Sequence, residues 1–85
     1  MEYLVVSFRS RAHTVKFYDI LKRNGVYAEI INTPKAAGVG CGLSVKTSTS
    51  SFAAVKNLLR AVGLSSFSGF FLVSMVGGKS VVRSI

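Results

Sequence analysis

Residues 2–25 read EYLVVSFRSRAHTVKFYDILKRNG, and within this stretch the hydrophobic pattern changes from that of a strand to that of a helix. Residues 2–8 are rich in the β-branched and aromatic side chains that favour strands. Ser10 offers a hydroxyl that can cap a helix, and one face of that helix then carries Thr14, Phe17, Tyr18 and Leu21. Gly25, which tolerates a left-handed conformation, is well placed to end the helix. The stretch therefore predicts a strand followed by an amphipathic helix.

The middle of the chain predicts two more strands and a second helix. We expect the strands over residues 26–31 and 43–47, separated by a flexible loop and by the break at Asn32, Thr33 and Pro34. The Ser/Thr cluster at residues 47–51 should cap the second helix, whose apolar stripe consists of Phe52, Val55, Leu58, Leu59 and Val62. Gly63 is expected to end it.

The C-terminal part completes a pattern typical of an α+β fold. A strand is predicted over residues 67–75, Gly77 and Gly78 form a turn, and residues 80–85 make either a short edge strand or a frayed tail. The order predicts a single ferredoxin-like βαββαβ domain over residues 1–85, with a four-stranded antiparallel sheet and two helices on one face. The first and third strands should then be central neighbours.

Composition narrows the class of protein and the sign of its partners. Hydrophobic residues make up 49% of the chain and charged residues 16%, which is too apolar for a disordered polymer. Eleven Lys and Arg residues against three acidic ones give a net charge of +8, so we expect anionic partners. Residues 67–76 form the longest apolar stretch, well short of the roughly 20 residues that span a bilayer. With no basic leader pattern at its start, the chain is predicted to be cytoplasmic and not membrane-bound.

The lone cysteine, Cys41, is the main candidate for chemistry. Gly38, Gly40 and Gly42 surround it, and such a loop can expose a thiol and let a ligand approach the backbone. The predicted fold places the start of the first helix at the same edge of the sheet. Positive charge there, from Arg9, Arg11, Lys35 and His13, would favour the thiolate at Cys41. The alternative is that Cys41 is an ordinary buried, structural side chain.

Other kinds of site find little support in the sequence. One cysteine and one histidine cannot supply the four ligands of a structural zinc site, and one cysteine cannot form an intrachain disulfide. The glycine-rich loop lacks the Lys-Ser/Thr that follows in a phosphate-binding P-loop. His13 has no carboxylate partner nearby in sequence, so a nucleophile, base and orienting group cannot be assembled. We therefore expect a binding protein without a cofactor rather than an enzyme.

Three short elements together resemble the selenium/sulfur (Se/S) carrier protein-like family of small prokaryotic proteins. They are Phe8-Arg9-Ser10 after the first strand, Thr33-Pro34-Lys35 after the second, and Gly40-Cys41-Gly42-Leu43 before the third. The resemblance extends over residues 3–73.

The resemblance implies that Cys41 carries sulfur or selenium as a persulfide or selenopersulfide. A cysteine desulfurase-type donor would load it, and an acceptor protein would receive the cargo. Pro34 and Lys35 would then shape the loop and attract anions, and Ser10 would cap the helix that faces the thiol. Such transfer requires a thiolate and an accessible sulfur, without a metal.

A second hypothesis is a basic module that binds nucleic acid or a second copy of itself. Open sheet faces of ferredoxin-like proteins can stack unpaired bases on aromatic side chains. Phe70 and Phe71 must face opposite sides of the sheet, and Tyr3 or Tyr27 could share the open face. Exposed apolar residues on that face would equally suit a homodimer.

Overall fold

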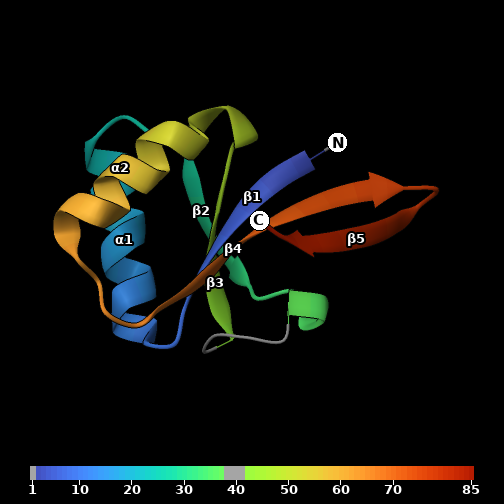
Figure 1. Ribbon diagram of the computed structural model, residues 1–85, viewed down its shortest axis with the longest axis horizontal. Coiled ribbons are helices and arrows are strands. Elements are labelled where there is room, and N and C mark those ends of the chain that lie inside the picture. Colours follow the sequence, from blue (N-terminus) through green and yellow to red (C-terminus); the bar gives the residue numbers. More distant parts are fainter. Residues whose placement is uncertain (1, 38–41) are drawn as a thin grey trace.

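The computed structural model describes residues 2–37 and 42–85, which form two α-helices, two short 3₁₀ turns and five strands (Figure 1). In chain order the elements are β1 (Glu2–Phe8), α1 (Arg11–Arg23), β2 (Ala28–Asn32), η1 (Lys35–Ala37), β3 (Leu43–Thr47), η2 (Thr49–Ser51), α2 (Phe52–Val62), β4 (Phe67–Val76) and β5 (Lys79–Ser84). The predicted α+β class is therefore confirmed. The second strand begins two residues later than expected because the Val26 N–H still bonds the Leu21 carbonyl at the end of α1.

The strands form one antiparallel sheet in the order β2-β3-β1-β4-β5. The predicted pairing of the first and third strands is confirmed, with Ser7 opposite Ser44. The predicted number of four strands is wrong, because the C-terminal residues form β5. Gly77 and Gly78 have φ angles of 56° and 79°, which a tight hairpin turn requires, so the chain folds back along β4.

The helices α1 and α2 lie on the same face of the sheet (Figure 1). Alternate residues of the strands point to this face, and the core there contains Leu4, Val6, Phe8, Phe17, Leu21, Val45 and Val55. The Phe8 ring contacts the rings of Phe17 and Phe67, with centroids 5.5 and 6.0 Å apart. Burial of these apolar side chains is the main source of stability for the βα units. The predicted helix faces are confirmed, except that Val62 at the end of α2 is exposed.

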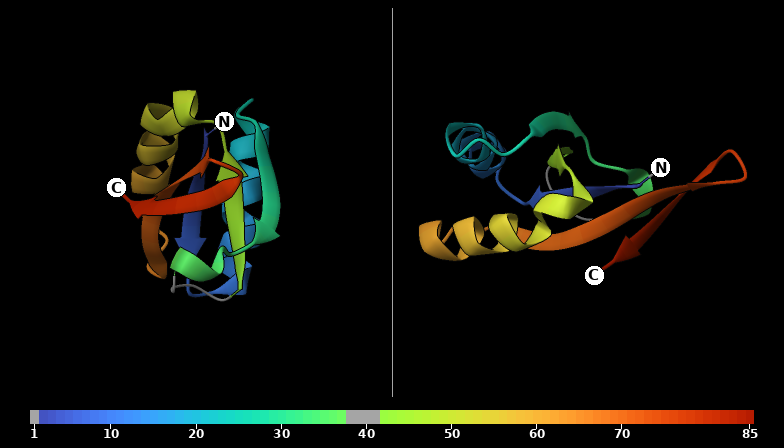
Figure 2. Two further views of the ribbon diagram at one scale, coloured as in Figure 1. Left: turned by 90° about the vertical axis from the view of Figure 1, so that its right-hand side faces the viewer. Right: turned by 90° about the horizontal axis from the view of Figure 1, so that it is seen from above.

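The opposite face of the sheet is covered rather than open. Val5 and Val73 are 0% and 1% exposed, and Phe71 is 7% exposed. Val82 of β5 and Ala37 of η1 pack against these residues. In the left view of Figure 2, the red strand β5 crosses in front of β1 and β3. The long β4 carries β5 over this face, which is why the expected open aromatic platform is absent at Phe71.

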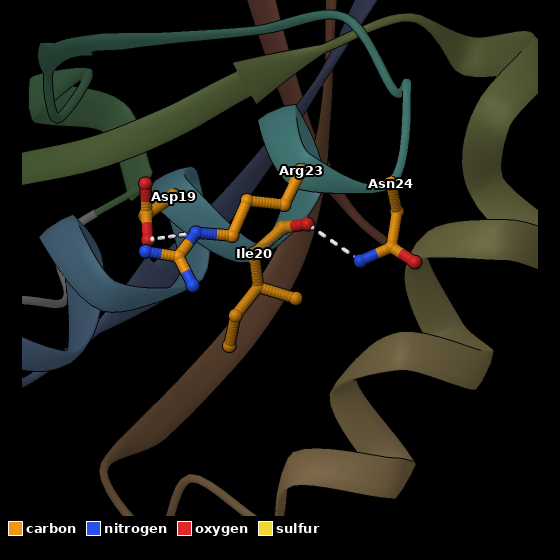
Figure 3. A network of polar contacts seen from close by, with 4 residues as sticks. All are labelled: Asp19, Ile20, Arg23 and Asn24. Atoms are coloured by element: carbon orange, nitrogen blue, oxygen red, sulfur yellow. Dashed lines mark hydrogen bonds and ion pairs between the residues drawn. The ribbon is translucent and has the colours of Figure 1, made fainter.

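The ends of the helices follow the sequence signals. Ser10 caps α1 by accepting the His13 N–H, and the Gly25 backbone beyond the helix has a φ of 73°. At the C-terminus the Asn24 side chain donates to the Ile20 carbonyl, at 2.7 Å, and Arg23 pairs with Asp19 at 2.9 Å (Figure 3). The Ile20 carbonyl also accepts the Asn24 backbone N–H, at 3.2 Å, so Asn24 closes the helix end with two donors.

Candidate functional site

The end of β1, the start of α1 and the start of β3 meet at one edge of the sheet. Ser7 and Ser44 are paired across β1 and β3, and Thr14 Oγ1 lies 3.5 Å from the Leu43 carbonyl. The expected proximity of the first helix to the start of the third strand is therefore confirmed. Gly40 and Cys41 lie outside the described residues, so their predicted roles stay predictions. Gly42 is described and exposed, with a φ of 96°.

A chain of hydroxyl groups anchors the start of β3. The Thr33 N–H donates to the Gly42 carbonyl at 2.8 Å. Thr33 Oγ1 lies 2.7 Å from Ser44 Oγ, which in turn lies 3.0 Å from Ser7 Oγ. Ser7 and Ser44 are both 0% exposed, so these bonds form away from water. The chain fixes the residue that follows Cys41 to the segment that precedes Pro34.

The sequence-based argument missed this hydroxyl chain, although a signal was present. Ser7 follows the apolar residues Leu4, Val5 and Val6 in β1, and Ser44 lies opposite it in β3. A buried hydroxyl needs a hydrogen-bond partner, so two serines at such positions could have been matched with each other. The third member, Thr33, was identified only as part of a motif.

A second cluster joins the start of α1 to the loop before β4. The Arg9 N–H donates to the Ser66 carbonyl at 2.8 Å, and the Ser10 N–H donates to Ser66 Oγ at 3.2 Å. His13 Nδ1 lies 2.6 Å from the same hydroxyl oxygen. Because Ser66 Oγ already accepts the Ser10 N–H, its hydrogen is available to Nδ1. The partner of His13 is thus a serine from a remote loop, which sequence order did not reveal.

Three of the predicted cations, Arg9, Arg11 and Lys35, are exposed, whereas His13 is half-buried. Arg9 and Arg11 flank the N-terminus of α1, whose first turn, fully described, holds no acidic residue. Lys35 begins η1, which closes with a bond from the Ala37 N–H to the Pro34 carbonyl. The helix N-terminus also carries partial positive charge. The anion-favouring role of these residues stays a prediction.

Residues 2–37 and 42–85 offer neither a metal site nor a membrane-spanning helix. Within these ranges, no group of three or more His, Cys, Asp or Glu side chains is placed to hold a metal ion. In the same part of the chain, no helix has the length and apolar character that crossing a membrane requires.

The comparison with known families gives a match at residues 3–67 to the family described as "Putative Se/S carrier protein-like". The chain belongs to this family. The match extends from β1 to the first residue of β4, and so includes Cys41 together with both hydroxyl clusters. Searches of curated proteins and of solved structures found no match. Most of β4 and all of β5 lie outside the matched region. The match therefore does not include β5, the strand that covers the second face of the sheet.

Proposed function

We propose that this Se/S carrier-like protein holds sulfur or selenium on Cys41 and delivers it to an acceptor protein. The family match carries the proposal, because it extends over the segment that contains the only cysteine of the chain. The roles of Arg9, Ser10, Arg11, Pro34, Lys35, Gly40 and Gly42 as loop-shaping and anion-favouring residues belong to the same proposal.

Loading is a transfer between sulfur atoms without net oxidation. The Cys41 thiolate attacks the outer sulfur of a donor persulfide, a new S–S bond forms, and the S–S bond of the donor breaks. The donor cysteine leaves as a thiolate, and Cys41 ends as a persulfide. Selenium follows the same balance, with an S–Se bond formed from a donor selenopersulfide. Delivery repeats the step, with an acceptor thiolate as the nucleophile.

Charge at the sheet edge supports the reaction and the choice of partner. Exposed Arg9, Arg11 and Lys35 favour a thiolate over a thiol nearby and attract a donor with an acidic surface. A cysteine desulfurase-type donor would dock on this edge. The alternative of a nucleic-acid platform across the sheet loses its main aromatic group, since Phe71 is buried.

The proposal extends to the setting in which the carrier works. The segment from β1 to β4 is interpreted as a ferredoxin-like core within a single domain, to which β5 is added. A reducing cytoplasm would keep the single cysteine reduced between transfers. A homodimer would remain compatible with docking at the edge that Arg9 and Arg11 flank.

The test is sulfur loading followed by intact mass spectrometry. Incubation with a persulfide donor should add the mass of one sulfur atom to the wild-type protein and none to Cys41→Ala. Native alkylation of Cys41 should be fast, with a midpoint below the pKa of about 8.5 of a free thiol. Labelling that occurs only in denaturant would refute the carrier function.

A matched pair of charge variants tests the electrostatic part. Arg11→Gln should slow loading and raise the alkylation midpoint, because it removes a cation at the proposed edge. Arg60→Gln removes the same charge from the exposed part of α2 and should leave both unchanged. Equal effects of the two variants would show that only net charge matters.

A further inference from the structure

A cavity of about 240 Å³ lies at the end of the sheet opposite to Gly42. It is formed where β1 begins and β3 ends, and its lining residues are Glu2, Tyr3, Tyr27, Lys46, Thr47, Ser48 and Thr49. We call it the Tyr3–Tyr27 cavity. A strand rises about 3.3 Å per residue, so the end of β3 that lines the cavity is roughly 13 Å from the start of β3 beside Gly42. It is therefore separate from the proposed carrier site.

Two aromatic rings and a cation meet in this cavity. Tyr27 is 50% exposed, which is high for a large aromatic side chain. Lys46 Nζ lies 4.6 Å from the centroid of the Tyr3 ring. Among the described residues the ion pair is that between Asp19 and Arg23, so Lys46 makes none. The ammonium group is therefore positioned by a ring and remains available to an anion.

Polar groups complete the lining. Thr47 Oγ1 donates to the Tyr27 carbonyl at 2.6 Å, which fixes the backbone beneath the exposed ring. Ser48 and Thr49 place two further hydroxyl groups at the start of η2. The Glu2 carboxylate accepts the Ser74 hydroxyl at 2.9 Å and retains capacity to accept further hydrogen bonds. The cavity thus combines stacking surface, one cation, hydroxyl donors and one acceptor.

We propose that the Tyr3–Tyr27 cavity binds a nucleoside monophosphate unit. The base stacks on the Tyr27 ring, the phosphate is bound by Lys46 and the Thr49 hydroxyl, and Glu2 accepts a ribose hydroxyl. Ligand pockets commonly have volumes of about 300–1,000 Å³, so this smaller cavity contacts a nucleotide from one side and does not enclose it. A ligand without an aromatic base would not stack on Tyr27, and a ligand without a phosphate would not bind Lys46 and Thr49.

The proposal is independent of sulfur carriage, since it uses no residue of the edge near Gly42. It also differs from the platform on the covered sheet face, because the stacking ring is the half-exposed Tyr27, whereas Tyr3 packs against the buried cluster that contains Phe71. Loss of loading at Cys41 would leave this proposal standing. Loss of nucleotide binding would likewise leave the carrier function standing.

The experiment is a nuclear magnetic resonance titration of the full chain with adenosine monophosphate (AMP). Resonances of Tyr27, Lys46 and Thr49 should shift, whereas those of Thr33 and Gly42 should not. Tyr27→Leu should weaken AMP binding about tenfold or more through loss of stacking. Its amide spectrum without ligand should match that of the wild type, because the Tyr27 side chain is half exposed.

Lysine variants, and ligands that contain only part of AMP, distinguish a specific binding site from nonspecific electrostatic attraction. Lys46→Gln should weaken AMP binding severalfold, whereas Lys56→Gln should not, although Lys56 also lies over a ring, 5.0 Å from the Phe52 centroid. Adenosine and ribose 5-phosphate should each bind more weakly than AMP. Equal weakening by both lysine variants, or equal binding of ribose 5-phosphate and AMP, would overturn the proposal.

The same titration distinguishes a free nucleotide from a unit of a single strand. A short oligoadenylate that shifts the same resonances at lower concentration, with a steep dependence on salt, identifies the unit as part of a strand. Equal affinity for AMP and the oligonucleotide identifies the free nucleotide. Absence of shifts at Tyr27 and Lys46 with both ligands would overturn the proposal.

Discussion

Substitution of Ser44 by alanine tests the buried hydroxyl chain that anchors the start of β3. Ser44 Oγ lies between Ser7 Oγ, at 3.0 Å, and Thr33 Oγ1, at 2.7 Å. Ser44→Ala removes both contacts at once. Ser7 is 0% exposed, so its hydroxyl would lose Ser44 as a partner without gaining water, whereas half-buried Thr33 can be hydrated.

The loss of stability expected for Ser44→Ala follows from the difference between buried Ser7 and half-buried Thr33. A buried polar group left without a partner costs about 1–3 kcal/mol, and most of this cost comes from Ser7. We expect Ser44→Ala to lower the free energy of unfolding by about 2 kcal/mol. For a domain of this size each kcal/mol shifts Tm by about 4–8 °C, so Tm should fall by roughly 8–16 °C.

Urea denaturation followed by circular dichroism measures this change, and a double-mutant cycle locates its cause. Ser7→Ala combined with Ser44→Ala should cost no more than Ser44→Ala alone, because the buried Ser7 hydroxyl is then no longer left unpaired. Amide exchange at Thr33, which donates to Gly42, should accelerate in Ser44→Ala. Ser80→Ala, at an exposed position of β5, serves as the control and should change stability by less than about 0.5 kcal/mol. Additive single effects, with unchanged exchange at Thr33, would refute the reasoning.

Three further substitutions test the fold. Phe8→Ala removes a buried ring that contacts Phe17, so stability should fall by about 3–5 kcal/mol, and retention of a normal urea midpoint would contradict this core. Ser10→Ala removes the cap that accepts the His13 N–H and should cost about 1 kcal/mol in thermal unfolding, with Ser10→Gly milder; equal losses would argue against capping. Gly63→Ala should also destabilise the protein, since Gly63 has a φ of 61°, and an unchanged Tm would show that the helix end rearranges.

Local patterns predicted most of the secondary structure because they depend on neighbouring residues. The change of period within residues 2–25 predicted β1 and α1, and Gly25 and Gly63 marked the helix ends that the structure shows. The fifth strand was left undecided between an edge strand and a tail. Its pairing depends on the length of β4 and on the turn at Gly77, and neither follows from the short segment at residues 80–85.

The candidate site was predicted only in outline. The order of elements correctly placed the start of α1 beside the start of β3, since strand pairing follows from the split βαβ arrangement. The contact between His13 and Ser66 joins residues 53 positions apart, and no periodicity relates them. The meeting of Tyr3 with Tyr27 in one cavity was likewise not predicted, because it depends on how the strand ends lie beside η2.

The sequence by itself determined the α+β class, the helix faces, the basic character of the chain and the single thiol on which the proposed carriage depends. These features follow from composition and from hydrophobic periods that act over a few residues. Only the tertiary structure showed that β5 covers the second face and that Ser7, Ser44 and Thr33 form one hydroxyl chain. Both result from packing between distant segments, since a buried polar group takes whichever partner the completed sheet brings within reach.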